Sequence, residues 1–110
     1  MGLTKTDNYT LEQVDLGKVL KVMGHPARIA ILQSIIRSQT CICGELVTEI
    51  GLAQATISQH LKELKSVGLI QGTIEGTSVC YCINKDTWLV VKSALDGLFE
   101  SANKCGTDCC

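Results

Sequence analysis

Cysteines are the side chains most able to do chemistry in this chain of 110 residues. The seven cysteines form two C-x-C pairs and a group near the C-terminus: Cys41 and Cys43, Cys80 and Cys82, and Cys105, Cys109 and Cys110. An odd number excludes complete pairing in internal disulfides, and the absence of any C-x-x-C excludes a thioredoxin-type redox pair and zinc knuckles. Because thiolates bind soft ions, these spacings indicate a site for a thiophilic ion or a redox-active thiol pair.

The composition indicates one small globular domain. Hydrophobic residues make up 45% of the chain, charged residues 19%, and the net charge is −1. No apolar run approaches the roughly 18 residues of a membrane span, and the polar start lacks the apolar core of a signal peptide. We therefore expect a cytosolic protein with no membrane partner, in a compartment that keeps thiols reduced.

Hydrophobic spacing predicts four helices, a β-hairpin and a final helix. Thr10 and Gln13 have the spacing of a capping box, Gly24 ends the first helix, and Pro26 begins the second with His25 just before it. The expected elements cover residues 11–23, residues 26–36, residues 44–50, residues 52–65, strands 69–75 and 78–83, and helix 85–102.

A helix-turn-helix is predicted where the third and fourth helices meet at Gly51. Ile57, Leu61 and Leu64 occupy one face of the fourth helix. Its short polar groups suit base edges and its lysines suit phosphates, whereas the alternative is that this face simply meets water. With a net charge of −1, DNA binding would depend on a local patch and be sensitive to salt. The candidate DNA-contacting residues are Gln54, Thr56, Ser58, Gln59, His60, Lys62 and Lys65.

Together these elements predict a mainly α fold with a two-stranded β-hairpin wing, a winged helix-turn-helix. Residues 1–10 are expected to be a flexible N-terminal segment, residues 11–102 the DNA-binding and dimerisation domain, and residues 103–110 a cysteine-containing C-terminal tail. Apolar residues on the last helix cover a wider arc than one packing partner needs. This width indicates that a second copy of the chain covers the helix.

Two segments resemble the ArsR/SmtB family of metal-responsive repressors: residues 20–32 (LKVMGHPARIAIL) and residues 54–70 (QATISQHLKELKSVGLI). Residues 41–46 (CICGEL) are similar to the arsenic-sensing branch, whose inducer thiols lie at the start of the third helix. The resemblance implies a homodimer, formed through the first and last helices, that binds a palindromic operator and releases it when a thiophilic ion binds. The last helix has no histidine, so the zinc site of another branch is not expected there.

Cys41 and Cys43 are therefore the expected metal ligands, with arsenite, As(III), as the expected inducer and antimonite or another soft ion as alternatives. The family's third thiol is absent from residues 44–48, so a tail cysteine is expected to replace it; alternatively, the tail forms its own trithiol site. Helical residues i and i+2 point about 200° apart. Ion capture is thus expected to distort the third helix and weaken DNA binding. The tail donors are Cys105, Cys109 and Cys110.

Cys80 and Cys82 are expected to share one strand face and to pack within the hairpin, outside the ion site. Three other functions stay open at this point. One is a repressor of the same fold that senses oxidants or reactive sulfur; the others are a small cytosolic thiol enzyme and a metal-binding chaperone. The sequence has no glycine-rich phosphate loop and no spare catalytic histidine, so we expect no enzyme activity.

Overall fold

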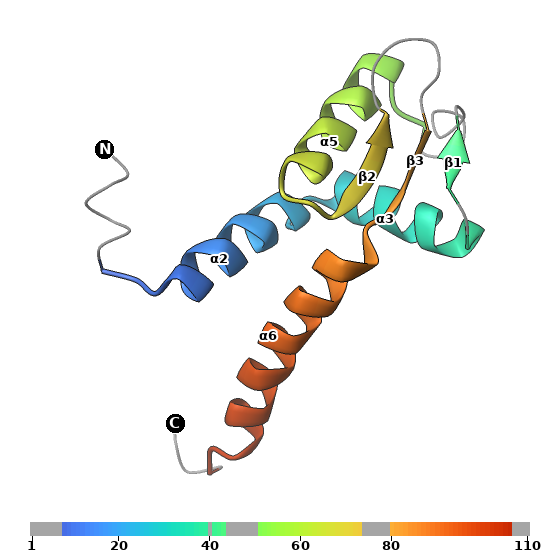
Figure 1. Cartoon of the computed structure of the whole chain (residues 1–110). Coiled ribbons are helices and arrows are strands. Elements are labelled where there is room, and N and C mark those ends of the chain that lie inside the picture. Colours follow the sequence, from blue (N-terminus) through green and yellow to red (C-terminus); the bar gives the residue numbers. More distant parts are fainter. Residues whose placement is uncertain (1–7, 40, 44–50, 74–79, 107–110) are drawn as a thin grey trace.

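The computed structural model describes residues 8–39, 41–43, 51–73 and 80–106. Figure 1 shows α3 and α5 lying against a small sheet, with α6 extending away from this body. The mainly α fold with a β2–β3 hairpin is confirmed; the helix expected at 44–50 and the turn at 75–77 lie outside the described residues. In chain order the elements are α2 (Leu11–Met23), α3 (Pro26–Ser38), β1 (Ile42–Cys43), α5 (Gln54–Ser66), β2 (Ile70–Thr73), β3 (Cys80–Ile83) and α6 (Lys85–Asn103).

The first two helices begin as the sequence predicts. The Gln13 amide donates to Thr10 Oγ1 and the Thr10 amide donates to Gln13 Oε1, both at 3.0 Å, which completes the capping box of α2. His25 caps α3, because its Nδ1 accepts from the Ala27 amide at 3.0 Å, and Pro26 is the first helical residue. These local bonds satisfy backbone donors that have no partner inside a helix.

A Schellman motif ends α5 and turns the chain into the sheet. Gly68 has a φ of +81°, and its amide bonds to the Lys65 carbonyl at 2.9 Å, while the Leu69 amide bonds to the Leu64 carbonyl at 3.1 Å. Leu64 and Leu69 are both buried, which is the hydrophobic contact that accompanies this motif. The turn thus fixes where β2 begins relative to α5.

The sheet has three antiparallel strands in the order β1-β3-β2, one more than the sequence predicts. β1 pairs Ile42 with Tyr81 and Cys43 with Cys80. The interpretation of Cys43 as part of a helix start is therefore wrong, because Ile42–Cys43 forms a strand. On the other side of β3, Gly72 has a φ of +128°, and a Cβ there would lie 2.2 Å from the Cys80 carbonyl oxygen, so only glycine fits.

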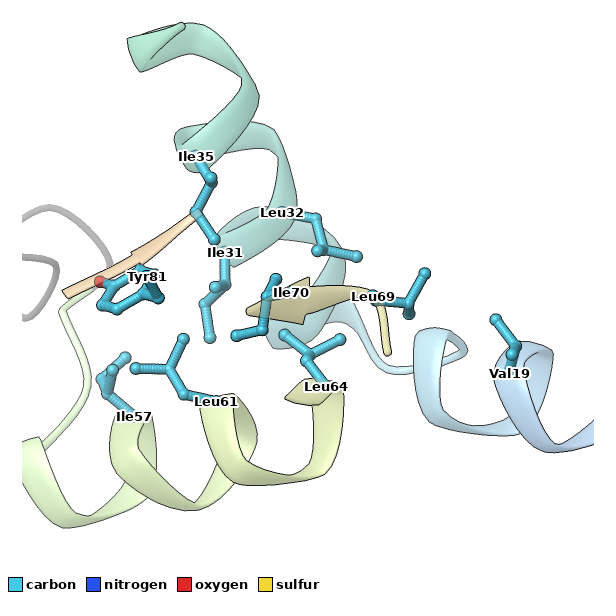
Figure 2. Packing of buried hydrophobic residues seen from close by; sticks show 10 residues of the cluster. All are labelled: Val19, Ile31, Leu32, Ile35, Ile57, Leu61, Leu64, Leu69, Ile70 and Tyr81. Atoms are coloured by element: carbon cyan, nitrogen blue, oxygen red, sulfur yellow. The ribbon is translucent and has the colours of Figure 1, made fainter. Parts of the chain in front are cut away.

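The hydrophobic core lies between α3, α5 and the sheet. In Figure 2, Ile57, Leu61 and Leu64 point from α5 towards the buried side chains of α3, with Ile70 between the two helices. Burial of each such side chain contributes about 1.5–3 kcal/mol to folding. The core consists of Val19, Ile31, Leu32, Ile35, Ile57, Leu61, Leu64, Leu69, Ile70 and Tyr81.

Helix α6 is anchored at its first turns and exposed along most of its length. Trp88 Nε1 donates to the Leu69 carbonyl at 2.9 Å and holds the helix to the core. Four large apolar side chains of α6 are between 58% and 69% exposed: Leu89, Val90, Leu98 and Phe99. Among the described residues no single helix is long and apolar enough to span a membrane, although α2 and α3 taken together across their 90° bend reach that length and composition.

Candidate functional site

Helix α5 presents a polar face on the side opposite the core. Thr56, Gln59 and Lys62 are exposed, and Ser58 is half-buried. The exposed Lys65 ammonium donates to the Gly72 carbonyl of β2, which ties this end of the helix to the sheet. The exposed groups lie on one rigid helix whose other face is fixed by the core, as base contact by a recognition helix requires. The side chain of Gln54 lies outside the described part of the structure.

His60 belongs to the inner side of α5, which corrects its inclusion among DNA-contacting residues. It is only 9% exposed, and its Nδ1 accepts a hydrogen bond from Arg28 Nε at 3.0 Å. The spacing of residue 60 from Ile57 and Leu64, three and four positions, could have placed it inside from the sequence alone. His60 therefore connects α5 to α3 rather than facing a ligand.

Arg28 joins three helices around His60. Besides His60, it contacts the end of α2, because its Nη1 donates to the Val22 carbonyl at 3.1 Å. The His25 and His60 rings lie 4.7 Å apart between centroids. Burial, followed by the positive charges of Arg28 and His25, lowers the pKa of His60 below its ordinary 6.5. The neutral imidazole is therefore the form that accepts from Arg28.

The second candidate site is a pair of thiols that come from distant parts of the chain. Cys41, just before β1, is exposed and Cys82, on β3, is half-buried; both are free thiols. A hydrogen bond between the two thiols is the largest of the causes that raise the pKa of Cys41 above its ordinary value, followed by desolvation and repulsion between the sulfurs. The structure thus places Cys82, which was expected to lie outside the ion site, beside Cys41.

The other cysteines are arranged differently from the prediction. Cys43 is opposite Cys80 in the β1–β3 register, and its side chain lies outside the described residues. Cys80 and Cys105 are each disulfide-bonded. Cys109 and Cys110 lie outside the described residues, so the expected meeting of tail thiols with Cys41 stays a prediction. Within the described part of the chain, no three metal-ligating side chains lie close enough together to hold a metal ion.

An open pocket of about 550 Å³ borders the Cys41–Cys82 pair. Its wall includes Ile36 and Gln39 from the end of α3 and Lys85, the first residue of α6. The thiol pair is consequently accessible to a small solute. It also lies where the sheet, α3 and α6 come together.

Cys82 was not predicted as a site residue because its partner, Cys41, lies 41 positions away, and local periodicity does not reveal such a pairing. A signal was nevertheless available. Both C-x-C pairs have the period of a strand, which puts their cysteines on one face wherever the segments are extended. Two such pairs on neighbouring strands can meet side by side.

Comparison with known proteins agrees with this fold. Residues 25–71 match the family described as "Bacterial regulatory protein, arsR family". The HTH-type transcriptional repressor SmtB of Mycobacterium tuberculosis is 40% identical over 65 residues, which are 59% of this chain and 47% of that protein. The chain thus spans about half the length of this relative.

A second relative is covered over most of its length. The HTH-type transcriptional regulator YgaV of Escherichia coli is 30% identical over 81 residues, 74% of this chain and 82% of that protein. The crystal structure of an ArsR family transcriptional regulator superposes with a TM-score of 0.70 over 86% of this chain and 96% of that one; at 20% identity, this likeness concerns the fold alone. SmtB, YgaV and the superposed structure are all described as transcriptional regulators and not as enzymes, in agreement with the prediction that this chain has no enzyme activity.

Proposed function

The chain belongs to the arsR family of bacterial regulatory proteins, and on that premise we propose that it is a transcriptional repressor that binds operator DNA in the cytosol and releases it when a thiophilic ion binds. Arsenite is the proposed inducer, with antimonite or another soft ion as the next choices. The operator is palindromic, because the proposed active form is a symmetric dimer. Release of the operator would allow expression of a resistance operon.

The observation that carries the DNA-binding proposal is the two-sided character of α5. Its apolar side chains are buried against α3 and β2, and this fixes which side chains face outwards. The outward groups include hydroxyl, amide and ammonium donors on Thr56, Gln59 and Lys62. Such groups are suited to base edges and phosphate oxygens of the major groove.

The dimer part of the proposal is supported by the exposed apolar surface of α2 and α6. Leu11 is 81% exposed at the start of α2, and Leu98 and Phe99 are exposed near the end of α6. Between α2 and α6 an open groove includes Leu16 and Val90 in its mainly apolar walls, and Glu12, Asp15 and Asp86 also line it. Exposed apolar surface of this extent is typical of a protein–protein interface, and in a homodimer a second α2–α6 pair would cover it.

For the sensing step we propose Cys41 and Cys43 as ion ligands, with a route to DNA that differs from distortion of a helix. In an extended segment, residues i and i+2 are on the same face, so the two positions can serve one ion without unwinding a helix. β3, the partner of β1, is followed after Asn84 by α6, and the Asn84 amide is held to the Leu69 carbonyl at 3.2 Å. Ion binding at this edge would therefore act on the orientation of α6 in the proposed dimer.

The tail remains the proposed source of a third thiol ligand. Cys105 lies two residues after the end of α6 and is disulfide-bonded, so it could donate a thiolate to an ion only after that bond is reduced. A tail cysteine of either chain of the proposed dimer could then approach Cys41. The proposed tail donors are Cys109 and Cys110, together with Cys105 once its disulfide is reduced.

A thiol redox sensor of the same fold is the second candidate, and one specific observation favours it. Cys80 is disulfide-bonded while Cys82, two residues away on the same strand, is a free thiol. Hydrogen peroxide could oxidise Cys41 and Cys82 to a second disulfide, in which two thiols lose two protons and two electrons and the peroxide becomes two molecules of water. Full response to peroxide but none to arsenite would favour this candidate.

The proposal is tested by fluorescence anisotropy with DNA from the promoter next to the gene, in the presence of a phosphine reductant. We expect specific binding at roughly nanomolar concentration and release on addition of arsenite. Equal affinity for a scrambled duplex at the same salt concentration would contradict the DNA-binding proposal. Specific binding that arsenite and antimonite leave unchanged would contradict the inducer.

A further inference from the structure

The ladder between β1 and β3 brings together two thiols that belong to different C-x-C pairs. We propose that Cys41 and Cys82 form a dithiol site for a trivalent arsenical or another thiophilic ion, so that Cys82 is a ligand of the sensor. The dithiol site adds Cys82 to the ligands of the proposed sensor and rests on the proposed function only for its effect on DNA binding.

The register of the ladder supports the pairing. Ile42 is opposite Tyr81 and Cys43 is opposite Cys80, and the same register continued by one position brings Cys41 opposite Cys82. Tyr81 is buried in the core, so its neighbours on β3 face the other side of the sheet. Directly opposed residues of an antiparallel pair have Cβ atoms about 4.5–5.5 Å apart, which places their side chains in contact.

The chemical state of the pair suits a ligand that takes two thiols. Cys41 and Cys82 are both free and hydrogen-bonded to each other. A zinc–sulfur bond is about 2.3 Å long, and bonds of this length allow one ion to join two thiols that are hydrogen-bonded to each other. Cys80 is disulfide-bonded and so does not contribute a free thiol to the same ion. Among the described side chains the pair therefore offers two thiol ligands, and Cys43, proposed above, or water or hydroxide would complete the coordination.

The reaction with a trivalent arsenical is balanced for two thiols. Two arsenic–sulfur bonds form, two arsenic–hydroxyl bonds break, and each hydroxyl leaves as water with one thiol proton. No electron is transferred, so neither an oxidant nor a reductant is required. This separates the dithiol site from the redox alternative, in which the same two thiols become a disulfide.

The position of the site gives it a mechanical role. The pocket beside the pair is bordered by Gln39 after α3 and by Lys85 at the start of α6. An ion bound to both thiols would lock β1 to β3 three residues before α6 begins. The locked edge would restrict the angle between α6 and the body that contains α5.

The test uses phenylarsine oxide, which condenses with two neighbouring thiols and releases one water. Three variants of the 110-residue chain retain only two cysteines each, the others being replaced by serine: Cys41 with Cys82, Cys41 with Cys43, and Cys41 with Cys105. In a phosphine reductant, mass spectrometry and competitive titration give stoichiometry and affinity. We expect one phenylarsenic group per chain and affinity at least about tenfold tighter for the Cys41–Cys82 chain than for the other two. Equal or tighter binding by the Cys41–Cys43 or Cys41–Cys105 chain overturns the proposal.

A second measurement covers the case in which these chains do not fold. In the reduced natural sequence, phenylarsine oxide should protect Cys41 and Cys82 together from alkylation by iodoacetamide, as read by peptide mapping. Unprotected Cys82 overturns the proposal. Neither measurement needs DNA, so capture of phenylarsenic by a protein that ignores operator DNA would refute the proposed function and leave the dithiol site standing.

Discussion

Removal of the Lys62 ammonium should change the salt dependence of DNA binding by a calculable amount. Lys62 is exposed on the outer face of α5, and the proposed homodimer would contain it twice. Each phosphate contact contributes about 0.9 to the slope of log affinity against log salt, so Lys62→Ala should lower the slope by about 1.8. Between 50 and 200 mM salt the natural protein should therefore lose about twelvefold more affinity than the variant. Anisotropy titrations at four salt concentrations measure both slopes.

Lys92→Ala is the matched control for this experiment. Lys92 has the same charge but lies on α6, where it pairs with Asp96 at 2.7 Å. Its removal changes the net charge of the chain as much as the removal of Lys62, and we expect no change of slope. Two results would refute the assignment of this face of α5 to phosphate contact. One is an equal slope for Lys62→Ala and the natural protein; the other is a slope lowered equally in Lys62→Ala and Lys92→Ala.

Three further predictions concern stability and assembly. Leu61→Ala should destabilise the fold by about 2–5 kcal/mol in urea unfolding, because Leu61 is 2% exposed in the core; a loss below about 1 kcal/mol would contradict that packing. The pKa of His60 is lowered in the folded chain, so the unfolded chain protonates this imidazole more readily. The stabilisation that the neutral His60 gives the fold is therefore complete above pH 6.5 and is lost as the pH falls through the folded pKa. His60→Asn keeps an acceptor for Arg28 but does not titrate, so its unfolding midpoint should vary less over this range; parallel curves would contradict the argument. The double substitution Leu98→Glu and Phe99→Glu should give monomers in sedimentation velocity. An intact dimer would exclude this exposed face of α6 as the interface.

Much of the fold could be predicted because its signals are local. The capping box at Thr10, the start at Pro26 and the helix-ending Gly68 depend on residues within a few positions of one another. The apolar stripe of α5 likewise follows from helical spacing and agrees with the buried set. Such features depend only on residues that are close together in the sequence.

β1 and the thiol pair could not be predicted in the same way. β1 is two residues long, too short for an alternating pattern, and its stability depends on a partner strand almost forty positions later. The resemblance favoured a helix start at the first C-x-C pair, where Ile42 and Cys43 form a strand. Register between distant strands, which local spacing does not encode, then decided that Cys41 meets Cys82.

Reciprocal coupling is the most direct test of the central claim that thiol ligation and operator binding oppose each other. The affinity for arsenite is measured with and without saturating operator, and the affinity for operator with and without saturating arsenite. Thermodynamic linkage predicts the same weakening factor in both directions, typically about 5–150-fold. Arsenite that binds the free and the DNA-bound protein equally well would contradict the account.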